Sequence, residues 1–501
     1  NSGSPRQPRV RQSAVLPEPG EDMESVRMDV NEFHFEDGAH AGDRATNDRW
    51  LLVARQAVAE LFGEPGERAF TIRYWNGELE NPGASAQPQF ELILRQPGAL
   101  RQMFFPPSEL ALGEAFIRGD FDVAGDLERA VALATALQER LRSPRRLARL
   151  TGLLLRLPTD AGRSPDRTRF RPSLPFVRRR HTRARAAAAI RFHYDVGNDF
   201  YSLWLDEQRV YSCAYFCADD DDLDRAQTAK LEHICRKLRL QPGEHFVDIG
   251  CGWGGLVRHA ARHHGVEALG ITLSRCQAEY ARERIAREGL ADRCRIEVCD
   301  YRDLPRGTTF DKVASVGMFE HVGGKQLRSY FSAAFALTRP GGLFLNHGIA
   351  SLEHARPHTV AELLTAFMWR KGKLIDRHVF PDSELVPLAD AIHQAEAAGF
   401  ETRDVESLRE HYARTLRHWV RRLEARAHDA AVATNEMTVR LWRLYMAASA
   451  YMFSVGRFGV AQVLLARPDL TGATPLPSTR HDLYLHPLET ATRSSLCNRA
   501  S

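Results

Sequence analysis

The sequence contains no apolar run that approaches the ~18 residues of a membrane-spanning helix. The longest candidate, residues 150–157, is short and is interrupted by Arg156. The first residues, NSGSPRQPRV, lack both the apolar core of a signal peptide and an initiator Met, so we expect the native start to be missing. The sequence therefore predicts no transmembrane helix.

Cysteine pairs at metal-binding spacing are also absent. The eight cysteines show no CxxC pair and no His/Cys cluster at zinc spacing, and they lie at positions 213, 217, 235, 251, 276, 294, 299 and 497. We expect reduced thiols in a cytoplasmic protein and no metal site. The acidic run Asp219–Asp222 is interpreted as a helix start, and His263–His264 as the end of a surface helix.

Lysine and acidic residues are scarce in one stretch of the chain. Residues 140–191 hold sixteen Arg, no Lys and two acids, a charge of +14, whereas the whole chain carries only +4. Five prolines rule out one continuous helix, although the leucine spacing of RRLARLTGLLLRL predicts a short one. An interfacial helix on anionic lipid, a solvated linker and an RNA-binding segment remain open, and no aromatic platform supports the last.

Two regions of regular pattern flank this block. Before it, residues 50–62 predict a helix, FTIRYWNG and QFELILRQP predict strands, and a second helix begins near Asp126. From about residue 240, strand and helix patterns alternate, which predicts a parallel sheet with helices on both faces. Residues 459–467 read as a late antiparallel edge strand. Ligands of such sheets bind at the carboxyl ends of the strands.

A glycine-rich turn follows the first strand of the alternating region. Asp248-Ile-Gly250-Cys-Gly252-Trp-Gly254 suits close approach of a ligand to a helix N-terminus. The string also satisfies a dinucleotide-binding pattern, but the second strand ends at Ser274 without the acid that this pattern expects. The turn looks more like motif I of class I S-adenosylmethionine methyltransferases, with a purely structural turn as the alternative.

A wider set of motifs resembles the cyclopropane-fatty-acid synthase family over about residues 190–430. The set comprises His193-Tyr-Asp-Val-Gly-Asn-Asp-Phe-Tyr201, Tyr211-Ser-Cys-Ala-Tyr-Phe216, Asp248–Gly254, Gly270-Ile-Thr-Leu-Ser274 with Gln277, Asp300-Tyr-Arg302 and Met318-Phe-Glu-His-Val-Gly323. The stretch LGEAFIRGDFDVAGDL is similar to the N-terminal domain of the longer bacterial members.

The resemblance implies an α/β class I methyltransferase fold, that is, a Rossmann-like, seven-stranded, mostly parallel sheet with a helical acyl-covering insertion. Segment 351–400 would supply the covering helices. The predicted division is a disordered segment 1–45, a small lipid-binding-like α+β domain 46–140, an Arg-rich linker 141–190, the methyltransferase domain 191–470 and a tail 471–501.

The resemblance also implies a reaction. The methyl group of S-adenosylmethionine would go to a cis double bond of a phospholipid acyl chain, a carbocation would form, and proton loss to a bound bicarbonate would close a cyclopropane ring. Relatives with the same core make methyl- or methylene-branched chains, which stays the alternative. A catalytically silent lipid-binding protein would have lost the base-binding residues, and a nucleic-acid methyltransferase would need a module that the sequence does not show.

By the same resemblance, each site residue receives a role. The cofactor would contact Tyr211, Ser212, Gly250, Gly252, Gly254, Thr272, Leu273, Gln277, Tyr301 and Arg302. The bicarbonate cage would comprise Cys213, Glu320, His347, Ile349 and Tyr412, with Cys213 and Ile349 acting through their main chains. Tyr194 and Tyr211 are candidates for cation–π stabilisation of the carbocation, with aromatic packing as the alternative. A helix-capping Glu320 and a core His347 are the corresponding alternatives.

Two positions depart from the family. Gly348 stands where Thr or Ser is usual, and Phe380-Pro-Asp-Ser383 replaces Phe-Pro-Gly-Gly in the cover, so acyl selectivity and product stay open. The expected partners are unsaturated phospholipid acyl chains and an anionic membrane surface that contacts Arg178, Arg179 and Arg180, without nucleic acid. The protein would attach peripherally to the inner face of the membrane. Family members are often dimeric, so a homodimer is among the implied assemblies.

Overall fold

The computed structural model describes residues 41–83, 87–141, 143–159, 193, 196–352, 373–380, 384–474 and 476–484. The contacts divide the chain into two compact units, Asn1–Asp48 and Arg49–Ser501, and every contact discussed below lies within the second. The predicted N-terminal disorder falls mainly on residues 1–40, outside the described residues, as do Tyr194 and the Arg178–Arg180 cluster. The predicted domain boundaries stay predictions. No helix among the described residues is both long and apolar enough to cross a membrane.

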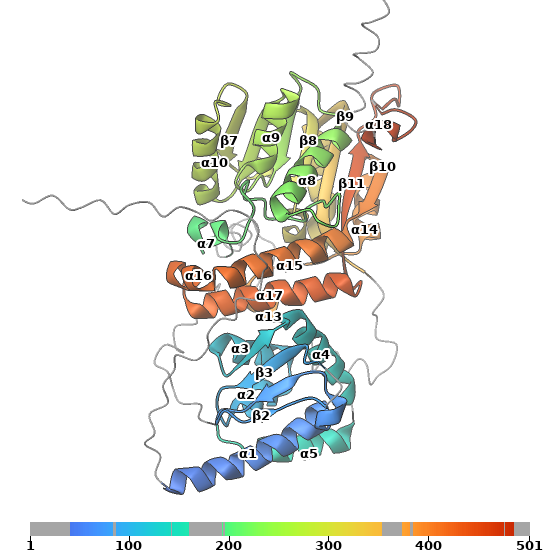
Figure 1. Cartoon of the computed structure of the whole chain (residues 1–501). Helices are drawn as coiled ribbons and strands as arrows, with labels where there is room; N and C mark the ends of the chain where they lie inside the picture. Colours follow the sequence, from blue (N-terminus) through green and yellow to red (C-terminus); the bar gives the residue numbers. More distant parts are fainter. Residues whose placement is uncertain are drawn as a thin grey trace, which may run out of the picture. The chain divides into compact units, whose positions relative to one another are not determined.

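A seven-stranded sheet forms the centre of the second half of the chain (Figure 1). Its order is β10 (Glu401–Ser407), β11 (Phe458–Ala466), β9 (Thr338–Ser351), β8 (Phe310–Val316), β5 (His245–Ile249), β6 (Glu267–Thr272) and β7 (Cys294–Val298). The five strands from β9 to β7 are parallel, and β10 and β11 are antiparallel to their neighbours. The predicted edge position of 459–467 is wrong, because β10 pairs outside β11. The polar sequence of β10 suits an exposed edge and hides the strand from a hydrophobic pattern.

Helices cover both faces of this sheet. Helices α8 (Leu223–Leu238), α9 (Gly255–His264) and α10 (Arg275–Arg287) pack on the face that Phe246 and Ala268 present. Helices α11 (Leu327–Leu337) and α14 (Leu388–Ala397) pack on the face that Val247 and Leu269 present. Because β5, β6 and β11 are buried on both sides over most of their length, their sequences are mostly apolar.

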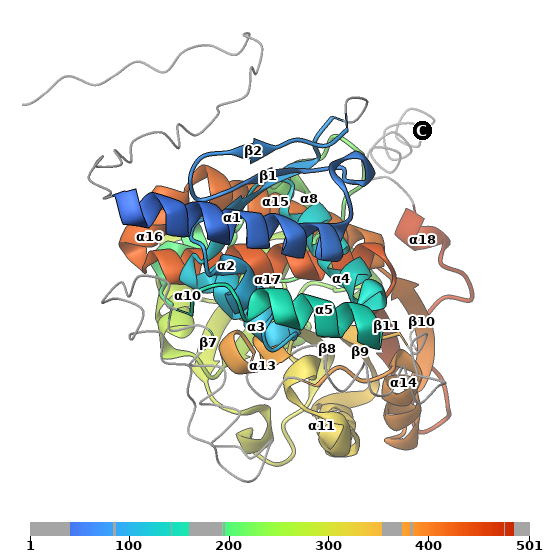
Figure 2. The same cartoon turned by 90° about the horizontal axis from the view of Figure 1, so that it is seen from below.

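The position of α14 corrects one prediction. Figure 2 shows α14 beside α11, and Ala391 and Ala395 are buried in the apolar cluster under the sheet. The helix therefore does not cover the active site, since its apolar face is used against the sheet. Residues 353–372 of the predicted cover lie outside the described residues, whereas residues 373–378, also within the predicted segment, do line a pocket of the active site through Ile375. The described cover consists of α13 (Lys373–His378), α15 (Arg409–Ala425) and α17 (Glu436–Ser454).

A smaller α+β module precedes the Arg-rich block. Its four-stranded sheet has the order β2-β1-β3-β4, in which only β1 and β3 are parallel. The elements are α1 (Ala41–Phe62), η1 (Pro65–Glu67), β1 (Thr71–Arg73), β2 (Leu79–Glu80), β3 (Phe90–Leu94), α2 (Ala99–Phe104), α3 (Glu109–Arg118), β4 (Phe121–Gly125) and α4 (Leu127–Arg140). Several of these elements agree with the sequence pattern. They are α1, which ends before Gly63, β1 and β3, which lie in the two predicted strand segments, and α4, which follows Asp126.

The leucine-rich helix of the Arg block is present as α5 (Pro144–Leu154). Its apolar face does not meet lipid: Leu150, Leu153 and Leu154, with Leu157 beyond the helix, are buried in the core of the small module. Arg101 Nη1 donates a hydrogen bond to the Leu157 carbonyl at 2.8 Å, which holds the end of this segment in place. The interpretation of this helix as interfacial is therefore wrong, because the module itself covers the leucines.

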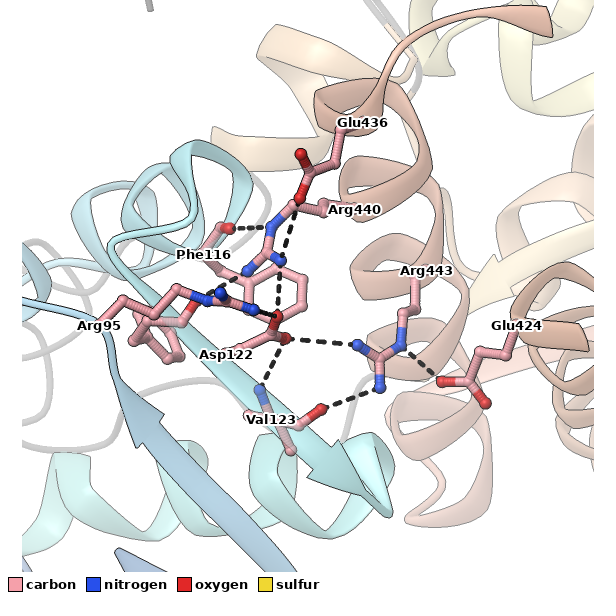
Figure 3. Close-up of polar contacts among 9 residues, drawn as sticks. Arg95, Phe116, Asp122, Val123, Glu424, Glu436, Arg440 and Arg443 are labelled. Atoms are coloured by element: carbon pink, nitrogen blue, oxygen red, sulfur yellow. Dashed lines mark hydrogen bonds and ion pairs between the residues drawn. The ribbon is translucent and has the colours of Figure 1, made fainter. Parts of the chain in front are cut away.

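Ion pairs join the small module to α17 (Figure 3). Asp122 of β4 accepts hydrogen bonds from Arg440 Nη1 at 2.7 Å and from Arg95 Nη2 at 2.9 Å, and Arg443 Nη1 lies 3.5 Å from its other oxygen. Arg440 also donates to the carbonyls of Phe116 and Phe121, both at 2.7 Å. Although burial opposes it, Arg440 holds the pKa of Asp122 below its ordinary value.

The remaining described elements are short or connect the larger ones. They are α7 (Asn198–Ser202), η3 (Tyr301–Asp303), η4 (Phe319–His321), η5 (Gly324–Gln326), α16 (Ala427–Ala433) and α18 (His481–Tyr484). Asp222 caps α8 by accepting from Arg225 N at 2.8 Å, as the acidic run 219–222 predicts.

Candidate active site

A pocket of about 410 Å³ opens at the carboxyl ends of β5, β6, β7 and β8. The strand order reverses between β5 and β8, which is where open α/β sheets bind ligands. The pocket brings together all but one of the predicted cofactor residues. Those that line it are Tyr211, Ser212, Gly250, Gly252, Thr272, Leu273, Gln277, Tyr301 and Arg302.

The glycine turn gives the pocket its floor. Gly250 and Gly252 have φ values of 85° and 54°, a region that side chains disfavour, so the tight turn needs glycine. A Cβ on Gly252 would meet no atom within 4 Å, which leaves its backbone open to a ligand. Gly254 does not line the pocket. It caps α9, and a Cβ there would lie 3.0 Å from Ala281 Cβ, so its role is helix packing.

Hydrogen bonds orient the polar side chains of the pocket rim. Thr272 Oγ1 donates to Gln277 Oε1 at 3.0 Å, and Ser274 Oγ accepts from Gln277 N at 3.4 Å as the cap of α10. Arg302 Nε donates to Asp300 at 2.7 Å, and the Arg302 guanidinium carbon lies 5.3 Å from the centre of the Tyr301 ring. These contacts hold the groups ready before any ligand binds.

A buried lysine beside the pocket was not among the predicted residues. Lys230 Nζ donates to Ser212 Oγ at 3.0 Å, and its neighbour Gln227 donates to the carbonyls of Val210 and Ser212 at 3.2 and 2.9 Å. Burial lowers the pKa of Lys230 and raises that of Asp248 to about 7, and the Lys230 charge opposes the rise at Asp248. The signal was present in the sequence, because Lys230 falls on the apolar face of α8 with Leu223, Ala226 and Leu231.

A second pocket, of about 290 Å³, adjoins the first and shares Tyr211, Ser212, Gly317 and His321 with it. Its walls are mostly apolar: Ile375, Phe380, Leu385, Leu416, Phe453, Phe458 and Val460. All five predicted cage residues line this pocket, namely Cys213, Glu320, His347, Ile349 and Tyr412. They come from segments far apart in the chain, so their convergence depends on the fold.

Two buried polar atoms face this pocket without a hydrogen-bond partner in the described part of the chain. They are Glu320 Oε2 and His347 Nε2. Glu320 Oε1 accepts from the Ile349 backbone N–H at 2.7 Å, and burial raises the Glu320 pKa to about 7. His347 Nδ1 accepts from Gln462 Nε2 at 3.3 Å, so Nε2 carries the hydrogen. Burial lowers the His347 pKa to about 3, which keeps the ring neutral.

Aromatic rings surround the junction of the two pockets. Tyr211 stacks on His193 at 5.6 Å and lies 5.1 Å from Trp419, and Tyr445 lies 5.6 Å from Phe380. Cys213 is fully buried, and burial raises its thiol pKa, so the side chain is not a nucleophile. His321 is a further residue of the junction that the prediction missed, and burial lowers its pKa to about 4.

The departure at Gly348 has a structural reason. A Cβ on Gly348 would lie 2.6 Å from Phe319 Cδ1, which is closer than real Cβ contacts allow. Phe319 directly precedes Glu320, so the small residue at 348 and the large ring at 319 form a matched pair beside the cage.

Known proteins share these features. Residues 181–463 match the family model described as mycolic acid cyclopropane synthetase, and residues 57–143 match a domain of unknown function (DUF7884). A "Probable fatty acid methyltransferase" from Pseudomonas putida is 41% identical over 82% of this chain and 95% of its own length. The cyclopropane-fatty-acyl-phospholipid synthase of Escherichia coli (strain K12) is 38% identical over 55% of this chain and 66% of its own length. A solved structure, mycolic acid cyclopropane synthase CmaA1 complexed with SAH and CTAB, is 32% identical with a TM-score of 0.52, over 56% of this chain and 98% of that one.

The sheet and its switch-point pocket define a class I S-adenosylmethionine-dependent methyltransferase, as the sequence predicted. Within that class, the chain belongs to the mycolic acid cyclopropane synthetase family, whose members transfer methyl or methylene groups to fatty acyl chains.

Proposed function

We propose that this enzyme adds a methylene group across the cis double bond of an unsaturated acyl chain on a membrane phospholipid, with S-adenosylmethionine as donor and bicarbonate as base. One observation carries the proposal. Glu320 Oε2 and His347 Nε2 are buried polar atoms in a mostly apolar pocket that adjoins the predicted cofactor pocket. Buried polar groups normally have partners, so such atoms favour a polar ligand at that point.

The first pocket suits the methyl donor. S-adenosylmethionine supplies an electrophilic methyl group when it is bound. Gly252 leaves room for its backbone contacts, Thr272 and Gln277 offer the polar edge, and Tyr301 with Arg302 offers a flat surface for a base. An alkene is a weak nucleophile, so reaction requires close alignment in a site without water.

The second pocket suits a hydrocarbon chain that becomes positively charged. Its apolar walls exclude water, which would otherwise trap a carbocation. The π-faces of Tyr211 and Tyr445 offer cation–π stabilisation without a nucleophile. The same role for Tyr194 stays a prediction.

The cage residues fit bicarbonate. When bound, bicarbonate supplies a base that does not itself capture the cation. The His347 Nε2–H would donate a hydrogen bond to it, and Glu320, whose pKa burial raises to about 7, could accept or hold a proton at Oε2. Cys213, Ile349 and Tyr412 complete the lining.

A branched product is the second candidate. Relatives that span 82% and 84% of this chain carry the name "Probable fatty acid methyltransferase", which does not specify a ring. Gly348, which lies against Phe319, also departs from the usual family pattern beside this cage. Loss of a different proton from the same cation would give a methylene-branched chain or a methyl-branched alkene.

The test is transfer of label from methyl-labelled S-adenosylmethionine to vesicles of unsaturated phospholipid. We expect label in the acyl chains, bicarbonate dependence, and loss of transfer in Glu320→Gln but not in the exposed Glu396→Gln on α14. Absence of transfer above the Glu320→Gln background would refute the proposal. Proton NMR of the released acids separates the products, because ring methylene protons and vinylidene protons give distinct signals.

We also propose that Arg178, Arg179 and Arg180 bring the enzyme to an anionic membrane surface at the inner face. The support is the charge of +14 over residues 140–191. Sedimentation with anionic vesicles at low salt should show weaker binding when all three are replaced by Gln. Unchanged binding would remove this cluster from the contact.

A further inference from the structure

Helices α8 and α9 bring together a cysteine and two histidines away from both pockets of the active site. The ligand atoms of Cys235, His259 and His264 all lie within 4.8 Å of one another. Cys235 is fully buried, and the side chains of His259 and His264 are only 10% and 17% exposed. None of the three lines the cofactor pocket or the acyl pocket in the part of the chain that the structure describes.

A carboxylate points at the same place. Glu232 Oε2 accepts from His259 Nε2 at 3.0 Å and from His264 Nε2 at 3.1 Å. Glu232 and Cys235 lie three residues apart on α8, and this spacing places both on the side of α8 that meets α9.

The geometry points to a structural zinc site formed by Glu232, Cys235, His259 and His264, which joins α8 to α9. One thiolate, two imidazoles and one carboxylate are a donor set that Zn²⁺ prefers, in the four-coordinate arrangement of closed structural sites. Bond lengths of about 2.0–2.3 Å place tetrahedral ligand atoms roughly 3.4–3.8 Å apart. Among Cys235, His259 and His264, the widest pair therefore needs to close by about 1 Å from the 4.8 Å limit. Glu232 would join them through the side of its carboxylate that already contacts both histidines.

The zinc site would stabilise the cofactor pocket through the two helices that it joins. Helix α8 carries Gln227 and Lys230, which hold the backbone and side chain of Ser212. Helix α9 begins directly after the glycine turn, at Gly255. An ion that ties the two helices together would stabilise both walls of the pocket without touching a ligand in it.

The simpler alternative is an ion-pair cluster of Glu232 with the two histidines. Cys235 distinguishes this alternative from the zinc site. Ion pairing does not need Cys235, whereas a metal–thiolate bond does. Cobalt is the probe: tetrahedral Co²⁺ with a thiolate ligand gives ultraviolet charge-transfer and visible absorption bands. The experiment uses the full chain without a histidine tag, under reducing conditions and after chelator treatment.

We expect the wild type to bind one Co²⁺ with both sets of bands and to release it when Zn²⁺ is added. Cys235→Ser should lose the charge-transfer band, whereas Cys294→Ser, a matched buried cysteine on β7, should keep it. His264→Gln should bind zinc on the order of 100-fold more weakly, and His245→Gln, an exposed histidine, should be unchanged. If Cys235→Ser does not fold, the difference in zinc affinity between His264→Gln and His245→Gln tests the proposal by itself.

Zinc should also raise the melting temperature of the wild type and leave that of His264→Gln unchanged, because only the native state would hold the four ligands together. Absence of the thiolate band in the wild type, or its persistence in Cys235→Ser, would overturn the proposal and leave the ion-pair cluster.

Discussion

Replacing Glu320 by Gln should make the protein more stable at alkaline pH while it removes activity. Burial raises the pKa of this carboxyl from 4.5 to about 7, so its ionised form costs about 3 kcal/mol more in the folded protein than in the unfolded chain. Gln keeps the acceptor for the Ile349 N–H but never ionises.

The sign follows from proton binding. Between pH 4.5 and about 7 the folded wild type binds more protons at Glu320 than the unfolded chain does. Its free energy of unfolding therefore falls as pH rises through this window and levels off above it. The free energy of unfolding of Glu320→Gln, relative to that of the wild type, should therefore increase by about 3 kcal/mol as pH rises from roughly 5 to 8.5.

Urea unfolding at a series of pH values measures this gain, and labelled methyl transfer measures activity, which should fall on the order of 100- to 10,000-fold. Glu396→Gln on the surface of α14 serves as the control. Parallel stability curves for wild type and Glu320→Gln would refute a buried carboxyl with a raised pKa. A variant with the predicted stability gain and full activity would instead refute a catalytic role.

Three further changes test other parts of the structure. Lys230→Met removes the donor to Ser212 and the positive charge beside Asp248, so S-adenosylmethionine should bind on the order of tenfold more weakly by calorimetry; unchanged affinity would refute a positioning role. Gly348→Ser should displace Phe319 and lower kcat for methyl transfer more than it changes KM for S-adenosylmethionine, and a variant with wild-type kcat would show that the ring moves freely. Arg440→Met should destabilise the protein by about 3 kcal/mol, because Asp122 loses its closest cation; a double-mutant cycle with Asp122→Asn should recover part of this, and additive losses would mean that the pair is not coupled.

Local pattern in the sequence was enough for the framework of the catalytic half. Alternation of strand and helix predicted the parallel sheet, and the run from Asp248 to Gly254 predicted a ligand turn at its carboxyl edge. Both are properties of neighbouring residues, since periodicity reports an element and its buried face. Of the predicted cage residues, Glu320 follows β8, His347 and Ile349 lie in β9, and Tyr412 lies on α15, so these four converge once the sheet and its cover form. Cys213 lies in a loop, and only the tertiary structure brings it to them.

Predictions from the sequence were wrong where the position of an element depends on a part of the chain far away in the sequence. The leucines of α5 have the spacing of a lipid-facing helix, but that spacing is the same when a protein core covers them. Strand β10 is polar because it lies at an edge, and α14 packs under the sheet although its pattern also suited a cover. For the two helices, periodicity showed which face is apolar but not which part of the protein covers that face.

The sequence by itself therefore determined the class of enzyme, through motifs whose chemistry depends on residues close together in the chain. Only the tertiary structure decided which polar groups are buried together. It placed Lys230 beside Asp248, Glu320 and His347 in one pocket, and Glu232 and Cys235 against the histidines of α9. The physical reason is that burial and pairing set the charge and pKa of these groups, and both depend on contacts between elements that no local spacing encodes.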